Sequence, residues 1–237
     1  LDDTFVSRML QNNRNTSLKR LVVGNVIEQK NHDLMVHGKG DAGPEHKGHM
    51  HGAHDPHIWL GIPQAIEMTK LIAEKLGEID SKKKDDYKKR ADAFIVELQK
   101  VHAEGKKAFD GKKSKSFITM HEAFEYFAHW DFGYDLDLVA PIQKKPGLDP
   151  DAVSMAKLIE TSKEKKVSVI AVEPQYSQAQ AETLQRSLKK SGIDAKIVTL
   201  DPLETAPIGA GSRFNPDPGY YLKKMRENID TLAKALP

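Results

Sequence analysis

The stretch AVSMAKLIETSKEKKVSVIAV, residues 152–172, decides the fold class. Its first part has the apolar spacing of an amphipathic helix, and its last part, VSVIAV, is a β-branched run of strand length. The same rhythm surrounds it, because the strand-like SFITM (116–120) precedes it, and the helical AQAETLQRSLKKSG (179–192) and strand-like KIVTL (196–200) follow. Short strands that alternate with amphipathic helices are typical of a parallel sheet covered by helices, so the sequence predicts an α/β fold.

Further elements are predicted on both sides of this region. Residues 57–79 and 218–236 have the apolar spacing of helices, and HEAFEYFAHW (121–130) is expected to be helical. The charged residues 81–111 carry a narrow apolar stripe and predict a helix about 40 Å long at ~1.5 Å per residue. Such a helix either bridges two bodies or lies on the periphery of one domain. The run LVVGNVI (21–27) is interpreted as a strand.

The composition excludes several classes of protein. Hydrophobic residues make up 39% of the 237 residues and charged residues 30%, so the chain is expected to bury a core of its own. The 36 basic and 34 acidic side chains nearly balance, which gives no reason to expect a nucleic-acid partner. Cysteine is absent, so a metal would have to be held by histidine and carboxylate. The first residues, LDDTFVSRML, look like the middle of a domain, so we expect part of the N-terminal region to be missing.

Histidine is concentrated in one segment, because seven of the ten histidines fall between residues 32 and 57. Residues 31–56 are rich in glycine and histidine and almost free of large apolar side chains, which predicts a mobile loop. His57 differs, since Pro56 stiffens the backbone before it and Trp59 follows. The remaining six are interpreted as a low-affinity metal collector, or alternatively as a neutral solubilising loop: His32, His37, His46, His49, His51 and His54.

Three further candidates follow the predicted strands directly. His121 comes after SFITM, Glu173 after VSVIAV and Asp201 after KIVTL. In an open parallel sheet, ligands bind outside the carboxyl ends of the strands, so these side chains are expected at one edge. Each also has a structural alternative: His121 could bond a carbonyl, Asp201 could form a turn before Pro202, and a salt bridge is the favoured interpretation of Glu173.

Four motifs, in order, resemble the metal-binding solute-binding proteins of bacterial ABC importers, cluster A-I type. They are HDPHIWL (54–60), MHEAFEYF (120–127), VEPQYSQAQAETL (172–184) and LDPLETAPIGAG (200–211), and the closest resemblance is to the zinc-specific branch with a histidine-rich loop. The resemblance implies two α/β lobes, each with a mostly parallel sheet flanked by helices. One long helix joins the lobes, and the metal lies in the cleft between them.

The resemblance also implies boundaries and ligands. Residues 1–81 would be the remainder of the N-terminal lobe, 82–112 the linking helix and 113–237 the C-terminal lobe. The implied metal ligands are His57, His121 and Asp201, and Glu173 lies near the cleft without being a usual ligand. Relatives that prefer manganese carry a glutamate where this chain has His121, so its imidazole favours Zn²⁺ over Mn²⁺. The family's first histidine ligand lies upstream of the first residue here.

The resemblance therefore implies an extracytoplasmic protein that captures Zn²⁺ and delivers it to an ABC permease. It would be a monomer in the periplasm or outside the cell, with a lipid anchor on the outer face of the cytoplasmic membrane as one option. The alternatives are a manganese-binding relative and a metal-dependent surface adhesin. A zinc hydrolase is disfavoured, because HEAFE places Glu125 where H-E-x-x-H has its second histidine.

Overall fold

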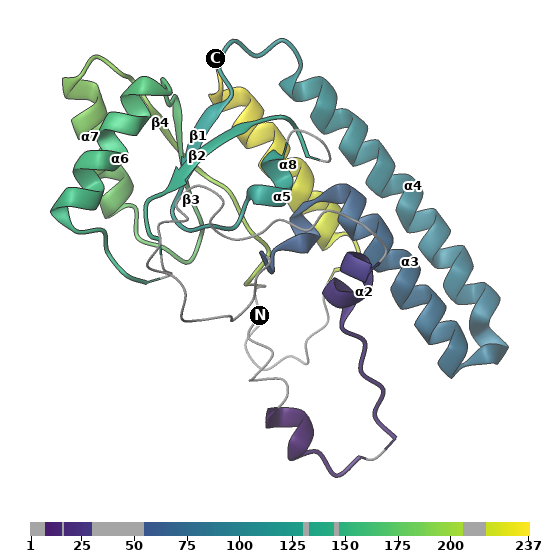
Figure 1. The fold of residues 1–237 in the computed structure, drawn as a ribbon. Coiled ribbons are helices and arrows are strands. Elements are labelled where there is room, and N and C mark those ends of the chain that lie inside the picture. Colours follow the sequence, from purple (N-terminus) through teal and green to yellow (C-terminus); the bar gives the residue numbers. More distant parts are fainter. Residues whose placement is uncertain (1–7, 16, 30–54, 130–132, 145–146, 206–216) are drawn as a thin grey trace.

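The computed structural model describes residues 8–15, 17–29, 55–129, 133–144, 147–205 and 217–237. In chain order the elements are α2 (Val23–Gln29), η1 (Ile58–Leu60), α3 (Ile62–Ile79), η2 (Ser81–Lys83), α4 (Lys84–Phe109), β1 (Ser116–Thr119), α5 (Glu125–Ala128), β2 (Asp137–Pro141), α6 (Ala152–Glu164), β3 (Val169–Val172), α7 (Ala179–Lys190), β4 (Lys196–Thr199) and α8 (Tyr220–Ala235) (Figure 1). The histidine-rich segment up to His54 lies outside the described residues.

The four strands form one parallel sheet in the order β2-β1-β3-β4. Strands β1, β3 and β4 lie where the sequence predicts them, and the predicted α/β class is confirmed. The edge strand β2 was not predicted. Because all four strands run in the same direction, their carboxyl ends meet at one edge of the sheet.

Helices cover both faces of this sheet, and the side chains of β3 show how. Val169 and Ala171 pack into a core shared with α4, α5 and α8, whereas Ile170 and Val172 pack into a second core shared with α6 and α7. Successive side chains of a strand point to opposite faces, so a strand buried on both sides is apolar throughout. Figure 1 shows α6 and α7 on one side of the sheet and α8 with α5 on the other.

The long charged helix is α4, which spans 26 residues. Its buried residues Leu98, Val101 and Phe109 lie on one side of the helix. This side packs into the core that α4 shares with α5, α8 and one face of the sheet. Helices α3 and α4 lie side by side, and α8 also contacts α4 (Figure 1). The helix expected over residues 81–111 is therefore present, while its role as a link between two lobes stays a prediction.

The N-terminal part contributes helices and no strand among its described residues. The strand expected at LVVGNVI is wrong, because α2 covers most of that run. Val23, Val26 and Ile27 recur at helical spacing and pack in one cluster with Leu71 of α3. Burial of this apolar side against α3 outweighs the strand preference of valine and isoleucine, which is small. None of the described helices is long and apolar enough to cross a membrane.

Candidate metal site

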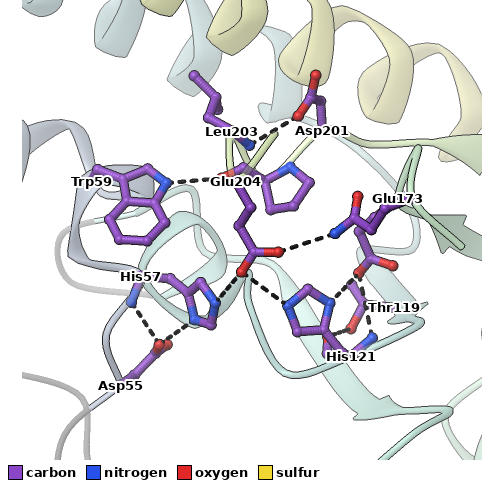
Figure 2. A network of polar contacts seen from close by, with 11 residues as sticks. Asp55, His57, Trp59, Thr119, His121, Glu173, Asp201, Leu203 and Glu204 are labelled. Carbon is purple, nitrogen blue, oxygen red and sulfur yellow. Dashed lines mark hydrogen bonds and ion pairs between the residues drawn. The ribbon is translucent and has the colours of Figure 1, made fainter. Parts of the chain in front are cut away.

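Three donor side chains from distant segments meet at the carboxyl edge of the sheet. His57 lies just before η1, His121 follows β1, and Glu204 lies in the segment after β4 (Figure 2). One ligand atom from each residue lies within 4.8 Å of the other two, and this is the only such group found in the described part of the chain. Both histidines are buried, and the Glu204 side chain is 31% exposed.

A single carboxylate oxygen lies between the two imidazole rings. Glu204 Oε1 is 2.9 Å from His57 Nε2 and 3.4 Å from His121 Nε2. The second oxygen of Glu204 accepts a hydrogen bond from Gln175 Nε2 at 3.0 Å. The Nε2 atoms of both rings and one oxygen of Glu204 therefore face a common point.

The opposite nitrogen of each ring contacts a buried carboxylate. His57 Nδ1 is 2.6 Å from Asp55 Oδ1, and His121 Nδ1 is 3.2 Å from Glu173 Oε1. Asp55 and Glu173 are each 1% exposed. Each histidine thus has a carboxylate on both ring nitrogens, with Glu204 shared between the two rings (Figure 2).

These contacts shift the pKa values of all three central groups. Burial lowers the pKa of His121, but the hydrogen bonds with Glu173 and Glu204 outweigh it and raise the pKa to about 9. Burial likewise opposes protonation of His57, whose pKa is nevertheless raised by Asp55 and Glu204. The hydrogen bonds from His121 and His57 lower the pKa of Glu204 to about 2. At neutral pH the His121 ring is therefore an imidazolium beside the ionised Glu204 carboxylate, and the raised pKa of His57 favours protonation of that ring as well.

Two hydrogen bonds fasten the segment of His57 to the segment of Glu204. Trp59 Nε1 donates to the carbonyl oxygen of Pro202 at 2.8 Å, and the Tyr221 hydroxyl donates to the carbonyl oxygen of Trp59 at 2.6 Å. These bonds connect η1, the segment after β4 and helix α8. The relative positions of His57 and Glu204 thus depend on Trp59, whose ring also packs edge-on against the His57 ring, and on Tyr221.

The structure brings His57 and His121 together and places Asp201 elsewhere. Asp201 Oδ1 accepts a hydrogen bond from the backbone nitrogen of Leu203 at 2.9 Å, and Asp201 Oδ2 is 3.5 Å from Lys224 Nζ. The Asn228 side chain bonds both the backbone nitrogen and the carbonyl oxygen of Asp201, each at 2.8 Å. Asp201 therefore acts as a turn former, the alternative stated above, and Glu204 is in the position expected of it.

Glu204 was missed by the sequence analysis, which considered the first residue after each strand. Leu203, between Asp201 and Glu204, has a left-handed backbone conformation with φ of 58°, and the side chains of Asp201 and Glu204 point in different directions (Figure 2). The expected helix at 121–130 is also shorter, because α5 begins at Glu125 and leaves His121 in the turn after β1. A search for every acidic residue within a few positions of Pro202 would have included Glu204.

Comparison with known proteins finds one matching family model and several similar proteins. Residues 1–235 match the ZnuA family, described as zinc-uptake complex component A, periplasmic. The chain is 34% identical to the zinc-binding lipoprotein AdcA of Streptococcus pneumoniae over 238 residues, which covers 99% of this chain and 44% of AdcA. The chain thus spans less than half of that relative.

Two solved structures have a similar fold. The laminin-binding adhesin Lmb of Streptococcus agalactiae, in a mutant structure, superposes with a TM-score of 0.69 at 29% identity, covering 88% of this chain and 69% of Lmb. A Zn(II)-bound mutant variant of AdcAII from Streptococcus pneumoniae superposes with a TM-score of 0.67 at 30% identity, covering 88% of this chain and 68% of AdcAII.

Proposed function

The chain belongs to the ZnuA family of zinc-uptake components, and from this premise we propose that it captures Zn²⁺ outside the cytoplasm and delivers it to an ABC permease. In this proposal His57, His121 and Glu204 bind the ion. The observation that carries the proposal is the convergence of these three donors from segments far apart in the sequence.

The spacing of the donors suits zinc. Zinc bonds nitrogen and oxygen donors at roughly 2.0–2.1 Å, so two donors of one tetrahedral ion lie about 3.3 Å apart. The distances from Glu204 Oε1 to the two Nε2 atoms, 2.9 and 3.4 Å, are already close to that value. An ion can therefore replace the hydrogen-bonded protons with small movements of the side chains.

The chemistry of the donors favours zinc over manganese. Two imidazole nitrogens and one carboxylate oxygen form a set that zinc commonly uses, whereas manganese prefers oxygen donors in higher coordination numbers. The described residues supply three donors, so the fourth comes from water or from a residue outside them. A manganese-binding protein remains the alternative within the same class.

The histidine-rich segment has a supporting role in this proposal. Its six histidines, His32 to His54, are proposed to collect zinc weakly and to raise its local concentration near the tight site. The last of these histidines, His54, is three residues before His57 in the sequence. Deletion of residues 32–54 should remove weak binding and leave the tight site intact.

Location and partners are proposed from the family and its relatives. AdcA is a lipoprotein by name, and the family is described as periplasmic, which supports a periplasmic or extracellular, lipid-anchored protein. We propose a monomer without a nucleic-acid partner or enzymatic activity. Lmb is described as a laminin-binding adhesin, so adhesion is the second candidate function.

Calorimetric titration with Zn²⁺ and Mn²⁺ tests the proposal. We expect one tight zinc site in the wild-type chain and its loss in His57→Ala and His121→Ala, because each variant removes a donor. Asp149→Asn is a matched control, since this carboxylate hydrogen-bonds Gln143 and contacts neither histidine. Unchanged zinc affinity in either histidine variant would refute the assignment of that histidine as a ligand.

Three assays separate the competing functions. Zinc uptake by cells that lack this protein should be restored by the wild-type gene and not by the His121→Ala gene. Zinc-dependent hydrolysis of esters or peptides by the purified chain would instead favour an enzyme. Laminin binding that survives in His121→Ala would support an adhesion function independent of the metal site.

A further inference from the structure

Two buried carboxylates lie beside the metal site without facing its centre, and we propose that Asp55 and Glu173 are positioning residues. They hold Nδ1 of His57 and His121 and so present Nε2 of each ring to the ion. This inference rests on the proposed zinc site and assigns a role to two residues that bind no metal themselves.

The two nitrogens of each ring have different carboxylate partners. A neutral imidazole has one N–H and one lone pair, and the nitrogen that carries the proton is set by its hydrogen-bond partner. Asp55 and Glu173 contact Nδ1, whereas Glu204 contacts Nε2 of both rings. A proton held on Nδ1 by a carboxylate leaves the lone pair on Nε2, which is the atom that faces the site.

Each of the two carboxylates also contacts the backbone of the histidine whose ring it holds. Asp55 Oδ1 accepts from the His57 backbone nitrogen at 2.9 Å, and Glu173 Oε1 lies 3.4 Å from the His121 backbone nitrogen. One oxygen therefore bridges the ring and the main chain of the same residue. The buried Tyr126 hydroxyl donates to the Asp55 carbonyl oxygen at 3.3 Å and holds that segment. This arrangement restricts ring rotation in both histidines.

Both buried carboxylates lower the stability of the fold. Asp55 Oδ2 and Glu173 Oε2 are buried and have no hydrogen-bond partner among the described residues. A buried acceptor without a partner destabilises a protein, and an apolar side chain of similar size would avoid this cost. With zinc bound, Asp55, Glu173 and Glu204 would surround a dication with three carboxylates. Their placement is therefore explained by metal binding and not by the stability of the fold.

Spectra of the zinc-loaded wild-type chain test the geometry directly. Long-range ¹H–¹⁵N correlation of ¹⁵N-histidine-labelled protein distinguishes a protonated ring nitrogen from a metal-bound one. We expect His57 and His121 each to show a protonated Nδ1 and a metal-bound Nε2. Zinc on Nδ1 of either ring would overturn the inference.

Variants of similar size test the effect on affinity. Asp55→Asn and Glu173→Gln replace a carboxylate by a weaker, neutral acceptor, and loss of such an outer partner typically lowers metal affinity about 10- to 100-fold. We expect Asp55→Asn to change the ring signals of His57, and Glu173→Gln those of His121. If Asp55 and Glu173 only supported the fold, each substitution would change the ring signals of both histidines. Asp149→Asn should change the ring signals of neither.

The outcomes keep the two proposals apart. A wild-type chain that binds no zinc refutes the proposed function. Tight zinc binding that both variants retain unchanged refutes only the positioning role. If a variant does not fold by circular dichroism, the wild-type spectra alone decide, because they report which nitrogen of each ring binds the ion.

Discussion

Asp201 and Glu204 lie three residues apart after the same strand, yet they belong to two different environments. Asp201 faces α8, where Lys224 and Asn228 contact it, and Glu204 faces the two histidines (Figure 2). The left-handed Leu203 between them separates the two directions. A carboxylate near the end of a strand is therefore not a ligand by position alone, since one backbone angle decides which environment it enters.

The largest expected effect on zinc affinity comes from replacing Glu204. Glu204→Gln removes the charge between the two imidazoles, and a neutral amide is a poor zinc ligand. Because loss of an outer partner already lowers metal affinity about 10- to 100-fold, loss of a ligand should lower it by at least about 100-fold. Competition with a chromogenic chelator measures this affinity. A Glu204→Gln chain that binds zinc like the wild type would return the ligand role to Asp201.

The two histidines that Glu204 faces make zinc affinity depend on pH. The pKa of His121 is raised to about 9, so zinc must displace a proton from this ring at neutral pH, and the raised pKa of His57 acts in the same direction. We expect zinc affinity to weaken by about tenfold or more per pH unit as the pH falls from about 8.5 to about 6.5. An affinity that is constant across this range would show that the rings are unprotonated in the metal-free chain.

The raised pKa of His121 also predicts how the stability of the chain without zinc changes with pH. The folded-state pKa of His121, about 9, exceeds its ordinary value of 6.5, so its ion pairs stabilise the fold fully below pH 6.5. This contribution is lost as the pH rises towards about 9. Urea unfolding across that window should show a falling free energy of unfolding, and a smaller fall in Glu204→Gln. A free energy that falls equally in both chains would exclude Glu204 as the partner.

The sequence alone predicts part of the fold and part of the candidate site. Strands β1, β3 and β4 were predictable because each is a short apolar run bounded by helices. His57 and His121 were identifiable because one follows a proline and the other ends a strand. Glu204 was not, because a leucine with φ of 58° is disfavoured by roughly 1–2 kcal/mol and no local propensity predicts it.

Helix α2 illustrates a second limit, since tertiary packing decided its structure. Its valines favour a strand by local preference, but Val23, Val26 and Ile27 fit the cluster with α3 only on one side of a helix. The choice between strand and helix depended on the position of α3, which lies beyond the reach of the local pattern. The same applies to contacts such as Trp59 with Pro202, which are long-range.

A smaller effect on zinc affinity is expected from replacing Gln175, which holds Glu204 without being one of the proposed ligands. Its amide donates to the second oxygen of Glu204, and the bond is exposed. Gln175→Ala should lower zinc affinity about three- to tenfold, at the weak end of outer-partner effects. Chelator competition measures the change, and Gln185→Ala is a control, since that amide bonds the Ala195 carbonyl oxygen. A loss as large as that of Glu204→Gln would mean that Gln175 itself binds the ion.

The smallest effect on zinc is expected at Asp201. Asp201→Asn keeps an oxygen that can accept from the Leu203 backbone nitrogen and loses only the ion pair with Lys224, whose charged atoms are 3.5 Å apart. The pair is partly exposed to solvent, so the free energy of unfolding should fall by about 1 kcal/mol or less. Zinc affinity should stay within about twofold of the wild type, because the conformation of Leu203 that directs Glu204 is retained. If Asp201→Asn instead lost the tight site while Glu204→Gln retained it, Asp201 would be the ligand, and its side chain would have to leave Lys224 and reach the histidines when zinc binds.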